Sequence, residues 1–321
     1  MNWFFTALIC VLGWGFADLF YKTGSSEEDE YSYLKIAVWV GLVMGAASLL
    51  LLSVNQGITA GHLGRNMLSY LPASASYIAS MVIGYAGLRY LELSIVSPVQ
   101  NASGALSMIA MILFFSVTGR GGEITDSFSG LDLSGVTLIV AGMIALAVTE
   151  QKIAEAGNSF SGAEKRYRKG ALALLFPLLY CLFDTVGTAA DGIILNEEAG
   201  LSLSETDVLI LYGFTFFLFG VISWLILRKK TGRFYHPFTK RELPKCAAAL
   251  CEEFGQVFYV YAMAENPVLA APMVASYCIV SVLLSRIFLR EKLKAAQYAC
   301  IIAVIAGIVL LGISEGLAER I

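Results

Sequence analysis

The chain has 321 residues, a mean hydropathy of +0.71 and only 15% charged side chains, which together exclude an ordinary soluble domain. Its net charge of −3 at pH 7 argues against nucleic acid as a partner. The six cysteines lie in apolar runs without CxxC or histidine spacing, so we interpret them as packing residues and expect no disulfide framework, metal centre or cofactor. The lack of a GxxxxGK[ST] loop argues against ATP-driven transport.

Apolar residues gather into runs of about 20, the length that crosses the hydrocarbon core of a bilayer as a helix. The connections between them are too short for a separate extramembrane domain. We therefore predict an all-α polytopic membrane protein. The ten expected spans lie at about residues 3–22, 33–54, 68–90, 94–117, 131–150, 170–195, 206–227, 246–264, 267–289 and 295–313.

Two parts of the chain repeat each other. Pro98 opens an apolar run that reaches Phe114, and Pro272 opens one that reaches Phe288 at the same spacing. Such repetition is typical of a transporter built from two inverted halves. The predicted units are a first five-helix repeat at 1–150, a basic connecting loop at 151–169 and a second five-helix repeat at 170–321.

The last two apolar runs form a hairpin around a charged elbow at residues 286–294, and the second run carries Ala303 and Gly307 four residues apart. This hairpin resembles the EamA-type repeat of the drug/metabolite transporter (DMT) superfamily. That repeat has a proline early in one helix, Leu-Gly-Glu at its end and a glycine-bearing final helix. Here the elbow reads Leu-Arg-Glu, with Arg290 where glycine is usual, and the first half lacks the acidic elbow at residues 117–123.

The resemblance also covers the first helix, where Trp14 and Gly15 are similar to the family's opening Trp-Gly. It implies a ten-helix transporter whose first, fourth, sixth and ninth helices face a central cavity. It further implies that Pro98 and Pro272 kink the fourth and ninth helices, with Asn101 among the polar residues that line the cavity. Alternatively, each proline lies in the first turn of a helix, where it breaks no hydrogen bond.

Lysine and arginine predict the orientation in the membrane. Roughly 19 of the 22 lie in or beside the connections between spans 1–2, 3–4, 5–6, 7–8 and 9–10, which the positive-inside rule assigns to the cytoplasm. With ten spans, both termini then lie outside. The family that the hairpin resembles generally has cytoplasmic termini, and we favour the charge distribution over the resemblance. The expected location is the plasma membrane.

Small residues lie on single faces of two predicted helices. Gly41 and Gly45 are four residues apart in the second span, and Ala303 and Gly307 repeat this spacing in the tenth. Such faces let helix backbones approach closely in lipid. We favour contacts within one subunit over a dimer interface, which leaves a monomer or a homodimer open.

Acidic residues inside the spans are the candidates for a binding site, because a charged side chain in the membrane interior is costly and marks a substrate or ion pathway. Asp184 lies near the middle of the sixth span, and Asp18 occupies the corresponding place in the first. Lys22 follows Asp18 by one turn, so a local ion pair is the alternative explanation for Asp18. Asp191 lies on the same helix face as Asp184 and is interpreted as an interfacial residue.

A second acidic feature lies in the eighth span, where Glu252 and Glu253 are adjacent and Gln256 follows one turn later. Neighbouring positions on a helix point about 100° apart, so at most one of the two acids faces a given cavity. Alternatively, this helix starts later and both acids lie at the headgroups beside Lys245.

These residues predict a transporter rather than an enzyme. We expect a small polar or amphipathic metabolite to cross by alternating access between the two repeats. Asp184, with Asp18 and Glu252 or Glu253, would bind a cationic group of the substrate or a coupling proton. The alternatives are a membrane-embedded enzyme or lipid-handling protein that uses the two glutamates with Lys245 and Arg241, and a membrane scaffold or sensor without transport.

Overall fold

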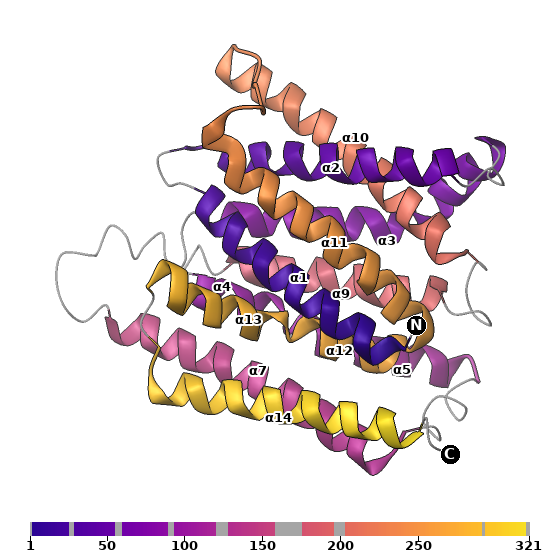
Figure 1. The fold of residues 1–321 in the computed structure, drawn as a ribbon, viewed down its shortest axis with the longest axis vertical. Coiled ribbons are helices and arrows are strands. Elements are labelled where there is room, and N and C mark those ends of the chain that lie inside the picture. The colour runs from indigo at the N-terminus through magenta and orange to yellow at the C-terminus, as the bar shows by residue number, and fades with distance from the viewer. Residues whose placement is uncertain are drawn as a thin grey trace.

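The structure is a computed structural model that describes residues 2–25, 29–54, 60–88, 93–119, 128–157, 175–195, 203–290 and 293–318. Over these residues the chain is helical and contains no strand (Figure 1). Parts of both predicted elbows and most of the basic connecting loop fall on residues 120–127, 158–174 and 291–292, which lie outside the described residues.

Eight long helices make up most of the bundle, and two further spans are each built from two shorter helices. The long helices are α1 Trp3–Gly24, α2 Ser32–Val54, α3 Ala60–Gly87, α7 Gly130–Gly157, α9 Leu175–Leu195, α10 Glu205–Thr231, α11 Leu243–Glu265 and α14 Ala295–Ala318. The divided spans are α4 Leu93–Gln100 with α5 Ser103–Val117, and α12 Pro267–Ala275 with α13 Tyr277–Leu284 and the π-helical turn Ser285–Leu289. A 3₁₀ turn at Lys240–Glu242 precedes α11.

Nine of the described helical segments are long and apolar enough to cross a membrane, which confirms an all-α, multi-pass membrane protein. The predicted eighth span is not among these nine, although it forms the continuous helix α11. The acids Glu252 and Glu253 lower the hydropathy of this helix.

The two largest errors in the predicted boundaries arise because helices continue past the apolar runs into polar sequence. Helix α3 begins at Ala60 rather than near residue 68, and α7 continues to Gly157 rather than ending near residue 150. The sequence after residue 150 is rich in Glu, Gln, Lys and Ala, which are good helix formers. The first part of the predicted connecting loop is therefore helical.

The fourth and ninth spans break at matching places. Pro98 lies inside α4 and Pro272 inside α12, not in their first turns. Each helix ends a few residues later. After the second break, Ile279 N donates an i→i−3 hydrogen bond, 2.9 Å long, to Ser276 O, as in a tighter 3₁₀ turn. The two breaks cross closely, because a Cβ on Gly104 would come within 2.7 Å of the Ala271 carbonyl oxygen.

Helices from the two parts of the chain pack in pairs: α2 with α10, α1 with α11, α3 with α9, α5 with α12, and α7 with α14. Figure 1 shows α2 and α10 along one edge of the bundle and α7 with α14 along the other, with the remaining helices between them. The N- and C-terminal ends lie at the same end of the bundle (Figure 1).

The faces of small residues form contacts between helices of the same chain. A Cβ on Gly41 would lie 2.6 Å from the Phe216 carbonyl oxygen of α10, and one on Gly307 would lie 2.6 Å from the Gly135 carbonyl oxygen of α7. Backbones approach this closely only where side chains are absent. These faces therefore bring α2 to α10 and α14 to α7.

Candidate functional site

Four carboxylates are buried in the middle of the bundle, each beside hydroxyl groups of other helices. Asp18, Asp184 and Glu252 are 9%, 9% and 2% exposed, and Asp191 is fully buried. Buried carboxylates are costly unless hydrogen bonds satisfy their oxygens. The hydrogen-bond partners of each acid therefore identify the helices that hold its carboxylate.

Asp18 of α1 is held by both divided spans. Its Oδ2 accepts hydrogen bonds from Ser97 Oγ of α4 and Ser281 Oγ of α13, each 2.7 Å long. The Lys22 ammonium donates to the Leu88 carbonyl oxygen at 2.7 Å. The partners of Asp18 thus come from distant parts of the chain, so a local ion pair with Lys22 does not explain this residue.

Glu252 of α11 points into the bundle. It accepts from Tyr77 Oη at 2.9 Å and from Tyr21 Oη at 3.2 Å, and Tyr85 Oη donates to Tyr21 Oη at 3.1 Å. Because α11 begins at Leu243, Glu252 lies well inside the helix, and the alternative of a later helix start is wrong. Glu253 is partly exposed, as expected for the adjacent position on the helix.

The two acids of α9 have different surroundings. Asp184 accepts from Ser103 Oγ of α5 at 2.6 Å. Asp191 accepts from Tyr70 at 2.5 Å, from Tyr259 at 2.9 Å and from Tyr212. Three phenol hydroxyls thus enclose the Asp191 carboxylate, while the interfacial depth of this residue stays a prediction.

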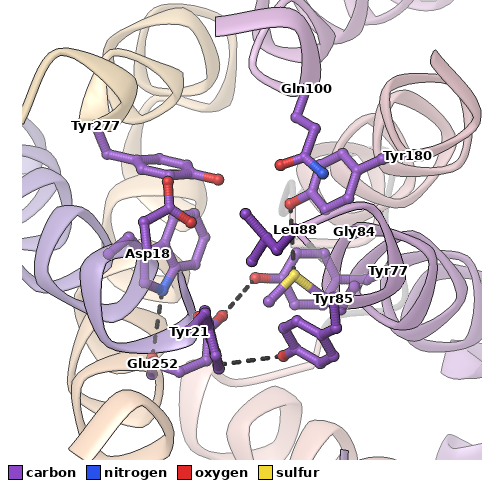
Figure 2. Close-up of a pocket in the computed structure, with 12 residues that line it drawn as sticks. Asp18, Tyr21, Tyr77, Gly84, Tyr85, Leu88, Gln100, Tyr180, Glu252 and Tyr277 are labelled. Carbon is purple, nitrogen blue, oxygen red and sulfur yellow. Dashed lines mark hydrogen bonds between the residues drawn. The ribbon is translucent and has the colours of Figure 1, made fainter. Parts of the chain in front are cut away.

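Two cavities lie between the helices. The first, the Asp18 cavity, is lined by Asp18, Glu252 and several aromatic side chains (Figure 2). The second, the Asp184 cavity, is lined by Asp184 and by residues of both divided spans. Both cavities are narrow spaces between side chains, which in this conformation admit water rather than a metabolite.

Four aromatic residues line both cavities and separate them. This aromatic partition consists of Trp14, Tyr77, Tyr180 and Tyr277. The Trp14 ring stacks on Tyr77 with 6.2 Å between centroids and meets Tyr277 edge-on at 5.6 Å. Trp14 Nε1 also donates to the Glu252 carbonyl oxygen at 3.3 Å, which fixes the ring against α11.

The polar residues after Pro98 divide between the cavities. Gln100 lines the Asp18 cavity, whereas Asn101 and Ser103 line the Asp184 cavity. Asn101 Nδ2 donates to the Ser97 carbonyl oxygen at 2.8 Å, near the break of the fourth span. Gln256 is 1% exposed and has no partner for either amide atom among the described residues, but it lines neither of these two cavities.

Lys245, one of the two basic residues of the enzyme alternative, is paired with a residue other than the two glutamates. Lys245 is 4% exposed and forms a 2.7 Å ion pair with Glu242, which also accepts from Tyr235 Oη at 2.8 Å. Burial, with the neighbouring Glu242 carboxylate, raises the pKa of the Tyr235 phenol well above its usual range, so the phenol remains a donor. This cluster stabilises the turn before α11.

Most of the tyrosines around these acids are site residues that sequence reasoning missed, because a tyrosine within an apolar run, unlike a carboxylate, has no large cost in lipid that singles it out. Tyr70 and Tyr77 are seven residues apart in α3 and share one helix face, which was the available signal. Among the described residues, no group of three His, Cys, Asp or Glu side chains could hold a metal ion. All six cysteines are free thiols.

Comparison with known proteins shows a similar fold but identifies no family. No protein family and no curated protein matches this sequence. One similar solved structure, titled only "Crystal structure of protein", superposes with a TM-score of 0.63 at 13% sequence identity, covering 99% of this chain and 98% of that chain. At this identity the likeness concerns the fold alone.

Proposed function

We propose that this chain is a secondary active transporter of the EamA type in the DMT superfamily, which moves a small polar or amphipathic metabolite across the plasma membrane. The observation that carries the proposal is the pair of matched acids, Asp18 and Asp184. Each is buried beside a cavity and bonded to serine hydroxyls of a divided span. Intramembrane carboxylates and broken helices at such places mark substrate and ion pathways.

The proposed architecture has ten crossings, with α11 as the tenth, in two inverted five-helix repeats at 1–150 and 170–321. Both termini lie at the same end of the bundle, which supports an even number of crossings (Figure 1). The helix pairs that join the two parts of the chain support the repeat. The first helix of the first repeat, α1, packs on the third helix of the second repeat, α11. Reciprocally, the third helix of the first repeat, α3, packs on the first helix of the second repeat, α9. Because each half would cross the membrane an odd number of times, the two halves would run through the membrane in opposite directions.

The proposed mechanism is alternating access across the aromatic partition. Rocking of one repeat against the other would open the Asp18 cavity and the Asp184 cavity in turn to opposite sides of the membrane. Asp184, with Asp18 and Glu252, would bind a cationic group of the substrate or a coupling proton. The narrow cavities are consistent with an occluded conformation, from which a metabolite enters only after one side opens.

The test is a proteoliposome assay of substrate-induced proton movement with amino acids, sugars and organic cations. Asp184→Asn should lower the transport rate by about tenfold or more, because a charge-assisted contact contributes ~1.5–3 kcal/mol. The matched control is Asp132→Asn, at a buried acid that accepts from Ser129 at the start of α7, away from both cavities. It should transport like the unsubstituted chain.

Two results would contradict the proposal. The first is equal transport by Asp184→Asn and the unsubstituted chain, which would remove Asp184 from the site. The second is the absence of both proton movement and tracer exchange for every substrate class, from protein shown to be folded. That outcome would favour the enzyme, lipid-handling or scaffold alternatives.

A further inference from the structure

One polar group at the wall of the Asp18 cavity has no hydrogen-bond partner among the residues that the structure describes. Gln100, the last residue of α4, is 4% exposed, and its Nε2 has no acceptor among the described residues. Figure 2 shows the amide end of this side chain directed into the cavity, across from Asp18. A buried donor without an acceptor is destabilising, so a buried amide in this position suggests that something else completes its hydrogen bonds.

The fold makes room for this amide. It lies against Gly84 of α3, where an added Cβ would come within 2.9 Å of Gln100 Nε2 and 2.7 Å of Tyr180 Cδ2. The bare backbone at Gly84 therefore lets the amide and the Tyr180 ring lie side by side at the cavity wall. The amide is thus held at a defined place by packing, with its N–H groups left free for another partner.

The opposite part of the cavity wall has different chemistry. It contains the carboxylates of Asp18 and Glu252 together with the rings of Trp14 and Tyr277. Carboxylates and aromatic faces both attract an ammonium group. A second negative charge on the ligand would be repelled by the two carboxylates, whereas a neutral oxygen can accept from the Gln100 amide without this repulsion.

We propose that Gln100 determines substrate specificity: its Nε2–H donates to a neutral oxygen of a substrate whose ammonium lies against Asp18 and Glu252. The substrate class is then a cationic amine that carries a hydroxyl or neutral carbonyl group. Zwitterionic amino acids and plain alkylamines are poorer ligands. This inference rests on the proposed transport function and narrows its substrate.

Three amines that share the isoamylamine core test the inference. Leucinol carries a hydroxymethyl group on the carbon that bears the ammonium, isoamylamine lacks this group, and leucine carries a carboxylate in its place. We expect full-length protein in nanodiscs to bind leucinol about threefold to tenfold more tightly than isoamylamine in calorimetric titrations, the effect of one neutral hydrogen bond. Leucine should bind most weakly of the three.

The variant Gln100→Leu removes the donor at similar volume and should abolish the preference for leucinol while isoamylamine binds as before. Gly84→Ala, which crowds the same amide, should reduce the preference as a second, independent variant. Gln256→Leu is the matched control, because this amide is equally buried and unpartnered but lines neither cavity. Its leucinol preference should be that of the unsubstituted chain.

Equal binding of leucinol and isoamylamine by the unsubstituted chain would overturn the role of Gln100 and leave the cationic site of the proposed function intact. A preference that persists in Gln100→Leu would overturn it as well. If no amine binds, and transport is also absent, the proposed function fails together with this inference. The two failures are therefore distinguishable.

Discussion

Three phenol hydroxyls converge on the fully buried carboxylate of Asp191, from Tyr70 of α3, Tyr212 of α10 and Tyr259 of α11. The carboxylate has several acceptor positions, so all three donors can be satisfied together. Because Asp191 belongs to α9, this cluster ties four helices from both parts of the chain. Tyr259 also lines the Asp184 cavity, which places the cluster next to the proposed transport site.

Removing one hydroxyl of this cluster should destabilise the protein. We expect Tyr259→Phe to lower the free energy of unfolding by ~1–3 kcal/mol, because the change leaves a buried carboxylate with one donor fewer. The measurement is thermal or denaturant unfolding in detergent. The control is Tyr298→Phe, at a ring that is 41% exposed and outside the cluster, which should change stability little. Equal stability of the two variants would contradict a structural role for the cluster.

At the residue scale, the acids were predictable and their partners were not. A carboxyl group within an apolar run is visible in the sequence, and its cost in lipid singles out Asp18, Asp184 and Glu252. The donors Ser97 and Ser281 lie far along the chain from Asp18, and nothing in their local sequence connects them with it. Only the crossing of the divided spans brings these hydroxyls together.

Close backbone contact holds the pair of helices α2 and α10 along one edge of the bundle. Gly41 of α2 faces Gly220 of α10, where an added Cβ would lie 2.9 Å from the Gly220 Cα and 2.6 Å from the Phe216 carbonyl oxygen. A backbone neighbour cannot move aside as a flexible side chain can. The distance between the two helices is therefore set by the absence of side chains at this crossing.

Alanine substitutions in two helical glycines should have opposite effects. Gly41→Ala should destabilise the protein by ~1–3 kcal/mol, because the new methyl group forces the two backbones apart. Gly64→Ala in α3 has nothing within 4 Å of its added Cβ and should stabilise the helix by up to ~1 kcal/mol. Unfolding measurements in detergent compare the two variants directly. A stabilising Gly41→Ala would contradict the close α2–α10 contact.

At the element scale, the spacing of small residues predicted a packing face, while the structure identified its neighbour. The same holds for the prolines. Pro98 and Pro272 indicated kinks or first-turn positions equally well from the sequence, because a helix start inside a continuous apolar run carries no distinct signal. The helix boundaries place both prolines inside helices, a few residues before each break.

The arrangement of charge over the whole molecule predicts its orientation. Helix α10 ends at Thr231 among exposed basic residues, whereas α2 ends at Val54 at the other end of the bundle (Figure 1). The positive-inside rule places the basic end in the cytoplasm and both termini outside. The family that the sequence resembles would place the termini inside.

Cysteine labelling distinguishes these orientations. In a background without the native cysteines, Val54→Cys should react with a membrane-impermeant maleimide in intact cells, because Val54 is 82% exposed and lies at the predicted outer end. Thr231→Cys, also at an exposed position, should react only after the membrane is permeabilised. The reverse pattern would contradict the charge rule and agree with the topology usual for the family.

The sequence alone determined the membrane class, the approximate spans and the acids that need a partner. It could do so because the bilayer imposes a length, an apolar composition and a cost for charge that are all local properties of the chain. The tertiary structure alone decided which hydroxyls satisfy each acid, that α11 points Glu252 inward, and that an aromatic partition separates two cavities. These features depend on contacts between helices far apart in sequence, which no local pattern specifies.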